Sequence, residues 1–276
     1  MDLVEQWLRD RPGVSWGCVP VPPPAQWFAC RRAGLLPSGR LWALVFCFPY
    51  AHPPAFGGNI SCYAAVPDYH RVIGDQLAQL AQQLAKATGH PFVPFVDSSP
   101  LDEVALAASC GLGIVGDNGL LITRQYGSYV FIGELITSCP LPRRTTALFR
   151  AGGCLHCGAC QKVCPGGAIA GGAVCTDRCL SHISQKKGEL TGWEQRLVAG
   201  SELLWGCDRC QLCCPMNRQA SPTALPGFLK DTVATVSKEQ LRPLCKTRAF
   251  GFRGPRVLER NWALQHPGPA GEVTEQ

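Results

Sequence analysis

The stretch that decides the fold begins with Cys154-x-x-Cys157-x-x-Cys160-x-x-x-Cys164-Pro165 and ends with Cys207-x-x-Cys210-x-x-Cys213-Cys214-Pro215. One further cysteine that matters, Cys179, lies between these two motifs. Both motifs repeat cysteine at every third residue and finish on Cys-Pro. This regular spacing, in a chain with 17 cysteines in 276 residues, predicts a unit that binds metal through thiolates.

The first motif has the spacing with which bacterial ferredoxins bind [4Fe–4S] clusters. Three of its thiolates hold one cluster, and the fourth, before a proline, reaches a second cluster. The swapped arrangement predicts Cys154, Cys157, Cys160 and Cys214 for the first cluster, and Cys164, Cys179, Cys207 and Cys210 for the second. Cys214 is preferred because it precedes a proline, as Cys164 does; its neighbour Cys213 is the alternative ligand.

Zinc binding or disulfide bonding could also account for so many cysteines. Two C-x-x-C pairs could hold tetrahedral zinc, but zinc does not need three cysteines in seven residues followed by Cys-Pro. Disulfides need an oxidising compartment, and the acidic, amphipathic N-terminal segment lacks the basic and apolar regions of a secretory signal. We therefore expect reduced cysteines in a cytoplasmic protein. The nine cysteines outside the two sets are expected to be mostly small core residues.

Composition is that of a globular protein with a substantial core. Apolar residues make up 46% of the chain, and no apolar run reaches membrane-spanning length. The net charge of +6 is uneven: residues 1–140 carry 8 basic and 10 acidic side chains, and residues 141–276 carry 18 and 10. A basic second half suits an anionic partner, such as RNA or an acidic electron donor, although a solvated basic face accounts for it equally well.

Periodicity predicts helices and strands on both sides of the cysteine motifs. A continuous apolar run at 41–48 predicts a buried strand, and leucines at helical spacing predict a long helix over 68–88 that ends before Gly89. Ser99 is expected to cap a further helix that runs to about Cys110. The remaining expected elements are helices at 3–9, 238–244 and 255–264 and strands at 91–96, 120–123 and 129–137. The predicted fold class is α/β (α+β), with an α/β domain at 1–145, a ferredoxin-like double-cluster domain at 146–225, and a partly helical extension with a frayed tail at 226–276.

Several stretches, in the right order from about residue 40 to 264, together resemble the epoxyqueuosine reductase family. They include Ile60-Ser61-Cys62-Tyr63-Ala64, Asp68-Tyr69-His70, Phe95-Val96-Asp97-Ser98, Gly133-Glu134, Arg178-Cys179-Leu180-Ser181, Gly206-Cys207-Asp208-Arg209-Cys210 and Phe252-Arg253-Gly254. The cysteine arrangement alone is shared with reductive dehalogenases, whereas the Val-Asp and Asp-Tyr-His pieces favour the queuosine enzymes.

The resemblance implies cobalamin and two [4Fe–4S] clusters as cofactors, tRNA as substrate, and a small electron donor such as ferredoxin or flavodoxin as partner. It implies a cobalamin-binding N-terminal domain closed by the cluster domain, in a monomer. Asp97 falls on the family's proton donor, at the corrin; Leu121, Leu180 and Asp208 fall on or near corrin-lining positions, and Lys187 falls where the family touches tRNA. A proton-donating carboxyl is favoured by burial against the corrin but disfavoured by the helix N-terminus expected just after Asp97.

The chain departs from the family pattern at several places, and three of them bear on its function. Cys62 stands where the family usually has arginine, and Asp117 stands where it usually has lysine. Pro267 and Pro269 follow the last matching segment, where full-length members continue into helical repeats. Two alternatives therefore remain: a corrinoid and iron–sulfur reductase for a small molecule, and an iron–sulfur electron-transfer protein without its own substrate.

Overall fold

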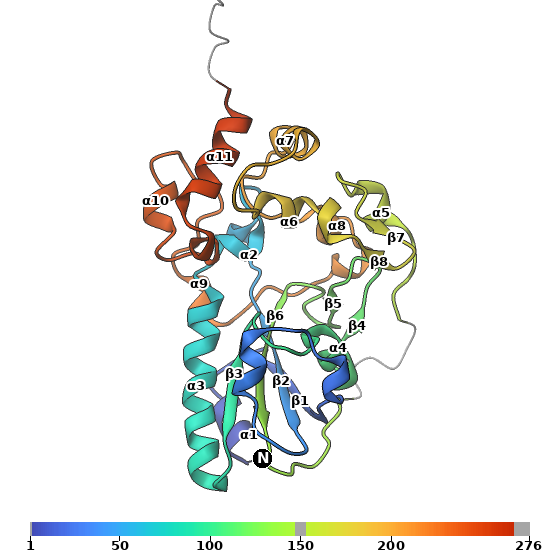
Figure 1. Cartoon of the computed structure of the whole chain (residues 1–276), viewed down its shortest axis with the longest axis vertical. Coiled ribbons are helices and arrows are strands. Elements are labelled where there is room, and N and C mark those ends of the chain that lie inside the picture. Colours follow the sequence, from blue (N-terminus) through green and yellow to red (C-terminus); the bar gives the residue numbers. More distant parts are fainter. Residues whose placement is uncertain (1, 147–152, 268–276) are drawn as a thin grey trace, which may run out of the picture.

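The computed structural model describes residues 2–146 and 153–267, and a four-stranded sheet forms the centre of its N-terminal half (Figure 1). The strands are β1 (Ser15–Pro20), β2 (Trp42–Pro49), β3 (Phe92–Phe95) and β6 (Val130–Thr137). Their spatial order is β1-β2-β6-β3, and every neighbouring pair is antiparallel. The mixture of helices and strands confirms the predicted fold class.

Strand β2 is buried on both faces, which explains its unbroken apolar sequence. Leu44, Phe46 and Phe48 pack on one face with helices α1 (Asp2–Leu8) and α3 (Tyr69–Thr88). Val45 and Cys47 pack on the other face with helix α4 (Glu103–Ser109). A strand covered on both sides has no polar face to alternate with its apolar one. The expected strand at 41–48 is thus confirmed, one residue later along the chain.

Helix α3 runs along the sheet and carries the start of the site at its N-terminus (Figure 1). Asp68 caps it by accepting a hydrogen bond from the His70 backbone N–H. Gly89 ends it in the left-handed conformation, with φ of 73°. Both ends agree with the sequence, because capping and the C-terminal glycine are local signals.

The helix expected to be capped by Ser99 begins later than predicted. Asp102 is the N-cap of α4, and its carboxylate accepts from the Ala105 backbone N–H at 2.9 Å. Ser99 Oγ instead accepts from the Leu101 N–H at 3.1 Å within the preceding turn. The expected helix N-terminus next to Asp97 is therefore wrong, and residues 96–102 form a loop. That loop has no helix dipole to favour a carboxylate at Asp97.

Apart from β6, the elements between residues 114 and 212, which include the cysteine-rich segment, are short. They are β4 (Ile114–Val115), β5 (Leu121–Ile122), α5 (Ala159–Val163), β7 (Ile169–Ala170), β8 (Ala173–Val174), α6 (Leu180–Ser184), α7 (Gly192–Ala199) and α8 (Arg209–Leu212). Helix α2 (Cys62–Ala65) lies beside α6 (Figure 1). Short 3-10 helices connect these parts at Pro24–Gln26, Arg31–Leu35, Pro53–Ala55, Thr176–Arg178, Pro215–Asn217 and Ala249–Arg253.

After Pro215 the chain returns to the N-terminal half. Its helices are α9 (Pro226–Leu229), α10 (Leu241–Leu244) and α11 (Pro255–Gln265). Phe228 and Phe250 are buried in the same core as Ile73 and Leu77 of α3. The expected frayed tail falls largely on 268–276, outside the described residues. Among the described helices, none has the length and apolarity that crossing a membrane requires.

Candidate active site

One small cavity gathers the four cysteines expected at the first cluster. Its lining includes Cys154, Cys157, Cys160 and Cys214. Cys213 does not line it, and its Sγ lies 3.6 Å from the Cys210 carbonyl oxygen instead. Cys157 is exposed, so this cavity opens toward solvent. Four thiols from two distant segments around one small space are a donor set that fits a [4Fe–4S] cluster.

A second cavity gathers the other expected set. Its lining includes Cys164, Cys179, Cys207 and Cys210. Cys164 Sγ accepts from the Ala168 backbone N–H at 3.2 Å, which orients the sulfur. Asn118 lines both cysteine cavities, so the two sets are neighbours separated by little more than one side chain. This donor set also fits a [4Fe–4S] cluster.

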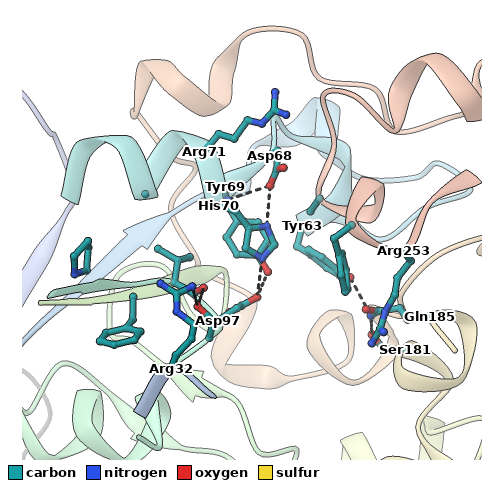
Figure 2. Close-up of a pocket in the computed structure, with 17 residues that line it drawn as sticks. Arg32, Tyr63, Asp68, Tyr69, His70, Arg71, Asp97, Ser181, Gln185 and Arg253 are labelled. Atoms are coloured by element: carbon teal, nitrogen blue, oxygen red, sulfur yellow. Dashed lines mark hydrogen bonds and ion pairs between the residues drawn. The ribbon is translucent and has the colours of Figure 1, made fainter. Parts of the chain in front are cut away.

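A cavity of about 950 Å³ lies beside the start of α3 (Figure 2). The start of α3 and the loop after β3 form one wall, and α6 with the 3-10 helix at Ala249–Arg253 forms the other. Among its lining residues are Asp68, Tyr69, His70, Asp97, Tyr63, Ser181, Gln185, Phe252 and Arg253. We call this space the reaction cavity. Its volume is at the upper end of the range for small-molecule and cofactor sites.

Asp97 presents its carboxylate to the reaction cavity from the loop after β3. Its backbone φ is 56°, in the left-handed region, and half of its side chain is exposed. The Tyr69 hydroxyl donates a hydrogen bond to Asp97 Oδ2. His70 Nε2 lies 3.6 Å from the same oxygen. Two donors from α3 therefore point at the residue predicted to be the proton donor (Figure 2).

His70 links Asp97 to Asp68. Its Nδ1 lies 2.8 Å from Asp68 Oδ1, and its Nε2 faces Asp97. Burial lowers the pKa of His70, but the hydrogen bond to Asp68 and the charges of Asp97 and Asp68 outweigh it, so the pKa is raised. The raised pKa favours an imidazolium between two carboxylates, and an imidazolium can pass a proton to either one.

The opposite wall is aromatic and tied together by hydrogen bonds. The Tyr63 hydroxyl oxygen accepts from Trp205 Nε1 at 2.7 Å and from Gln185 Nε2 at 3.2 Å. Phe252, 57% exposed, contacts Trp205 edge-on. Arg253 Nε is buried and has no hydrogen-bond partner among the described residues. The cavity thus offers a flat apolar wall and an unused donor, a combination that fits a planar ligand with polar substituents, such as a corrin with its amides and phosphate.

Three residues expected at the corrin do not line the reaction cavity. Leu121 is 4% exposed and packs beneath α4. Leu180 lines the second cysteine cavity. Asp208, 6% exposed, accepts from the Cys62 backbone N–H at 2.7 Å. Burial raises the pKa of Asp208 to about 6, although the Cys62 N–H opposes this.

Lys187 lines a separate groove of about 850 Å³, which also includes Arg253, Arg256 and Arg260. Arg260 is partly committed to structure, because its Nη1 donates to the carbonyl oxygens of Lys186 and Gly188 at 2.7 and 2.8 Å. Arg253 lines both this basic groove and the reaction cavity. A positively charged groove therefore leads to the edge of the reaction cavity.

Asp117 and His156 form a pair beside the first cysteine cavity. Asp117 Oδ1 lies 2.8 Å from His156 Nδ1, and Asp117 is 8% exposed. Together with Cys154 they place three possible metal-binding atoms within 4.8 Å of one another. Asp117, which stands where the family usually has lysine, is thus held by a histidine of the first cysteine motif.

The sequence did not assign roles to several residues of the site. His70 and Tyr69 belong to the Asp-Tyr-His segment that resembles the family, and this resemblance was the one sequence feature that could have pointed to them as site residues. Arg253 lay in another matching segment, but its position between two cavities depends on the folded chain. His156 lies inside the first cysteine motif, where spacing draws attention to the cysteines alone.

Two family models match the chain. The one described as "Epoxyqueuosine reductase QueG, DUF1730" matches residues 41–98, and the "4Fe-4S double cluster binding domain" matches residues 153–217. The chain therefore carries a double [4Fe–4S] binding domain. Epoxyqueuosine reductase of Pseudomonas aeruginosa is 38% identical over 171 residues, 61% of this chain and 46% of the relative. That of Vibrio cholerae is 36% identical over 209 residues, 72% of this chain and 55% of the relative. The chain spans about half the length of these curated relatives.

Solved structures share the fold over nearly the whole chain. Epoxyqueuosine reductase from Streptococcus thermophilus superposes with a TM-score of 0.74 at 22% identity, over 96% of this chain and 80% of that one. An epoxyqueuosine reductase crystallised with a tRNA-Tyr epoxyqueuosine-modified stem loop gives a TM-score of 0.77 at 21% identity, with the same coverage. The family model over residues 41–98 and the relatives of 36–38% identity place this chain in the epoxyqueuosine reductase family.

Proposed function

We propose that this protein reduces epoxyqueuosine to queuosine in tRNA, using cobalamin and the two [4Fe–4S] clusters. The observation that carries the proposal is the reaction cavity, where Asp97 faces the space with Tyr69 and His70 behind it. Removal of the epoxide oxygen takes two electrons and two protons, breaks both C–O bonds, forms a C=C bond and releases water. The chain must therefore deliver electrons and protons to one place.

The arrangement of the two cysteine sets supports an electron route toward the reaction cavity. Cys157 of the first set is exposed, which suits contact with a small donor such as ferredoxin or flavodoxin. Leu180 lines the second cysteine cavity, and its neighbour Ser181 lines the reaction cavity. We infer that electrons enter at the first set and leave from the second. A reducing compartment such as the cytoplasm keeps these thiols available.

The reaction cavity supports cobalamin as the bound group. Reduced cobalamin supplies electrons to an electrophilic carbon when it is bound. The aromatic side chains of Tyr63 and Phe252 would cover a flat macrocycle, and the unpartnered Arg253 Nε would donate a hydrogen bond to one of its polar substituents. A large bound ligand here would also exclude water from Asp97, half of whose side chain is otherwise exposed.

Protons reach the leaving oxygen through Asp97 in this proposal. Asp97 donates a proton to the epoxide oxygen, and His70 restores it from 3.6 Å away. Asp68 holds the His70 ring in the orientation that makes this possible. Tyr69, which is stacked on Phe131 at 4.0 Å between ring centroids, fixes Asp97 Oδ2 from the other side.

The basic groove supports RNA as the carrier of the substrate. Lys187 and Arg256 would contact phosphates, while Arg253 lies where the groove meets the reaction cavity. An enzyme that acts on a base in RNA needs that base turned out of its stack into a pocket. Because the groove leads into the cavity, the RNA backbone can bind in the groove while the modified base enters the cavity.

Anaerobic turnover tests the proposal. The cluster-loaded protein is mixed with cobalamin, a strong reductant and an epoxyqueuosine-modified tRNA stem loop, and queuosine is measured by mass spectrometry after digestion. Product formation that requires cobalamin is the expected result. Absence of product despite loaded clusters and bound cobalamin would favour a small-molecule reductase, a candidate supported by the Cys62 and Asp117 departures. Absence of cobalamin binding would leave an electron-transfer protein.

Replacing His70 with glutamine should slow turnover. His70→Gln removes the proton carrier but keeps a polar side chain, so we expect a loss of about tenfold to a hundredfold. Because the His70 pKa is raised, wild-type turnover should fall as pH rises through that pKa, and the variant should lose this limb. The measurement is a pH–rate profile of wild type and His70→Gln. The control variant is His90→Gln, because His90 lies past the end of α3. Unchanged profiles in both variants would exclude His70 from proton transfer.

Replacing Lys187 with alanine should weaken RNA binding through charge alone. Each lost phosphate contact reduces the slope of log K against log salt by about 0.7 to 0.9. Lys186 is unsuitable for this test because it pairs with Glu194 at 2.5 Å. Binding of the tRNA stem loop is titrated at several salt concentrations, with Lys230→Ala as the control outside the groove. An unchanged slope in Lys187→Ala would place the RNA elsewhere.

A further inference from the structure

An apolar groove adjoins the first cysteine cavity. It has a volume of about 510 Å³, and its lining includes Phe56, Tyr129 and Leu212. The rings of Phe56 and Tyr129 meet edge-on at 5.4 Å between centroids, and Leu212 is 60% exposed. An exposed leucine beside two aromatic rings, in a concave space, is a surface that a partner can cover. We call this space the apolar groove.

One short segment separates the apolar groove from the first cysteine cavity. Leu212 and Asn217 line the groove. The residues between them that line the cysteine cavity are Cys214, Pro215 and Met216. A molecule seated in the groove is therefore a single chain segment away from the position predicted for the first cluster.

The exposed apolar surface continues on the first cysteine motif. Leu155 lines the first cysteine cavity and is 59% exposed, and Cys157 in the same motif is exposed as well. Helix α5, which follows them, contacts helix α8, which carries Leu212, and Figure 1 shows the two helices on the same side of the molecule. Both cysteine motifs thus contribute exposed apolar side chains around the predicted first cluster.

The charge of this surface is positive. No aspartate or glutamate occurs in the four segments that form or flank it: 51–56, 124–129, 154–165 and 209–222. Their exposed basic side chains are Arg124, Lys162, Arg209 and Arg218. Within residues 2–146 and 153–267 none of the four takes part in an ion pair, unlike Lys186, which pairs with Glu194. The neighbouring carboxyl groups of Asp117 and Asp208 are buried, so the positive charge is not offset at the surface.

Two of these cations lie at the rim of the apolar groove. Arg218 directly follows Asn217, which lines the groove. On the opposite segment, the backbone N–H of the lining residue Ser221 donates to the carbonyl oxygen of Gln125 at 2.8 Å, and Arg124 is the next residue. An apolar centre with a basic rim is complementary to a partner with an apolar centre and an acidic rim.

We propose that this surface is the docking site of a small acidic electron carrier of the flavodoxin type. The apolar edge of its flavin enters the apolar groove beside Phe56 and Tyr129, and its carboxylates face the four basic side chains. The reduced flavin gives up one electron and becomes a semiquinone, the first cluster takes that electron, and no bond is broken. A transient contact of this kind needs less buried area than a stable complex. The proposal rests on the proposed function in taking the first cysteine set as the point where electrons enter.

Binding of oxidised flavodoxin to the cluster-loaded protein tests the surface without cobalamin, RNA or turnover. The double variant Arg124→Glu with Arg218→Glu should bind about tenfold more weakly or less at low salt, and this difference should shrink as salt screens the charges. Leu212→Ser should weaken binding about tenfold at every salt concentration, because the lost contact is apolar. The matched control is Arg9→Glu with Lys86→Glu, the same change of charge at exposed positions after α1 and in the last turn of α3.

Stopped-flow transfer from flavodoxin hydroquinone, followed by the appearance of the semiquinone, is the second measurement. The double variant should accept electrons from flavodoxin more slowly than wild type and the control, whereas dithionite at high salt should reduce all of them at the same rate. Equal iron content shows that the variants are loaded, and if Leu212→Ser loses iron, the double variant still decides.

Three results would overturn the proposal. One is equal flavodoxin affinity and transfer rate in wild type and the double variant. Another is a loss of binding to the tRNA stem loop in the double variant with flavodoxin binding unchanged, which would assign the surface to RNA. The third is a dimer of the chain that Leu212→Ser dissociates, which would assign the groove to a second copy. Because neither measurement uses the epoxide, failure of this proposal is distinguishable from failure of the proposed reduction.

Discussion

Asp97→Asn should abolish reduction of the epoxide while leaving the cofactor sites intact. Asparagine keeps the shape of aspartate but has no proton to give to the leaving oxygen. General acid catalysis contributes about 10² to 10⁴ in rate, so turnover should fall by that factor. The change is local: Asp97 is half-exposed in the reaction cavity, and its side chain touches Tyr69 and His70 but none of the eight predicted cluster ligands. The measurement is anaerobic single turnover of the tRNA stem loop.

The control variant is Asp75→Asn, an exposed aspartate further along helix α3. It should turn over at the wild-type rate. Iron content and cobalamin binding should be equal in wild type and both variants, which separates loss of the proton donor from loss of a cofactor. Turnover by Asp97→Asn within a few-fold of wild type would remove Asp97 from the reaction and make its position in the cavity structural.

Cys214→Ala should remove one complete cluster, whereas Cys213→Ala should not. Cys214 lines the cavity with Cys154, Cys157 and Cys160, and Cys213 does not. Because a [4Fe–4S] cluster needs four ligands, iron should fall from about eight to about four atoms per chain in Cys214→Ala. The remaining cluster should be the one at Cys164, Cys179, Cys207 and Cys210. Turnover should be lost too, because electrons enter at the first set in the proposed route.

Iron and sulfide analysis after anaerobic reconstitution measures this, and the electron paramagnetic resonance spectrum of the reduced protein shows whether two interacting clusters or one isolated cluster is present. The two adjacent cysteines make an unusually close control, since the variants differ by one position. The opposite result, loss of a cluster in Cys213→Ala alone, would make Cys213 the cluster ligand in place of Cys214. Loss in both variants would point to a cluster domain that does not fold without either thiol.

The cysteine half of the molecule could be predicted well because its information is local. Cysteines three residues apart, followed by Cys-Pro, form the known ligand pattern of a [4Fe–4S] cluster within one short segment. The two cavities contain the same two groups of four that the spacing predicts. Long elements were equally accessible: α3 was predicted with both of its ends, because the apolar periodicity lies within it and Gly89 follows it directly.

Elements that depend on distant partners were missed or displaced. Strand β1, just before a proline-rich segment, was not predicted, and it forms because Ser15–Pro20 pairs with Trp42–Cys47 of β2. The α4 start was assigned to Ser99 although Asp102 caps it. Both serine and aspartate are good caps, and the choice between them depends on the conformation of the loop at 96–102, where Ser99 Oγ accepts from the Leu101 N–H.

The sequence alone predicted a double [4Fe–4S] binding domain and a resemblance to the epoxyqueuosine reductase family, because ligand spacing and short matching segments are properties of neighbouring residues. Two features became visible only in the folded chain: His70 lies between Asp68 and Asp97, and Arg253 joins the basic groove to the reaction cavity. The reason is physical. A pKa, a cavity wall or an electron route is set by groups that are close in space, and here those groups come from α3, the loop after β3 and the C-terminal segment.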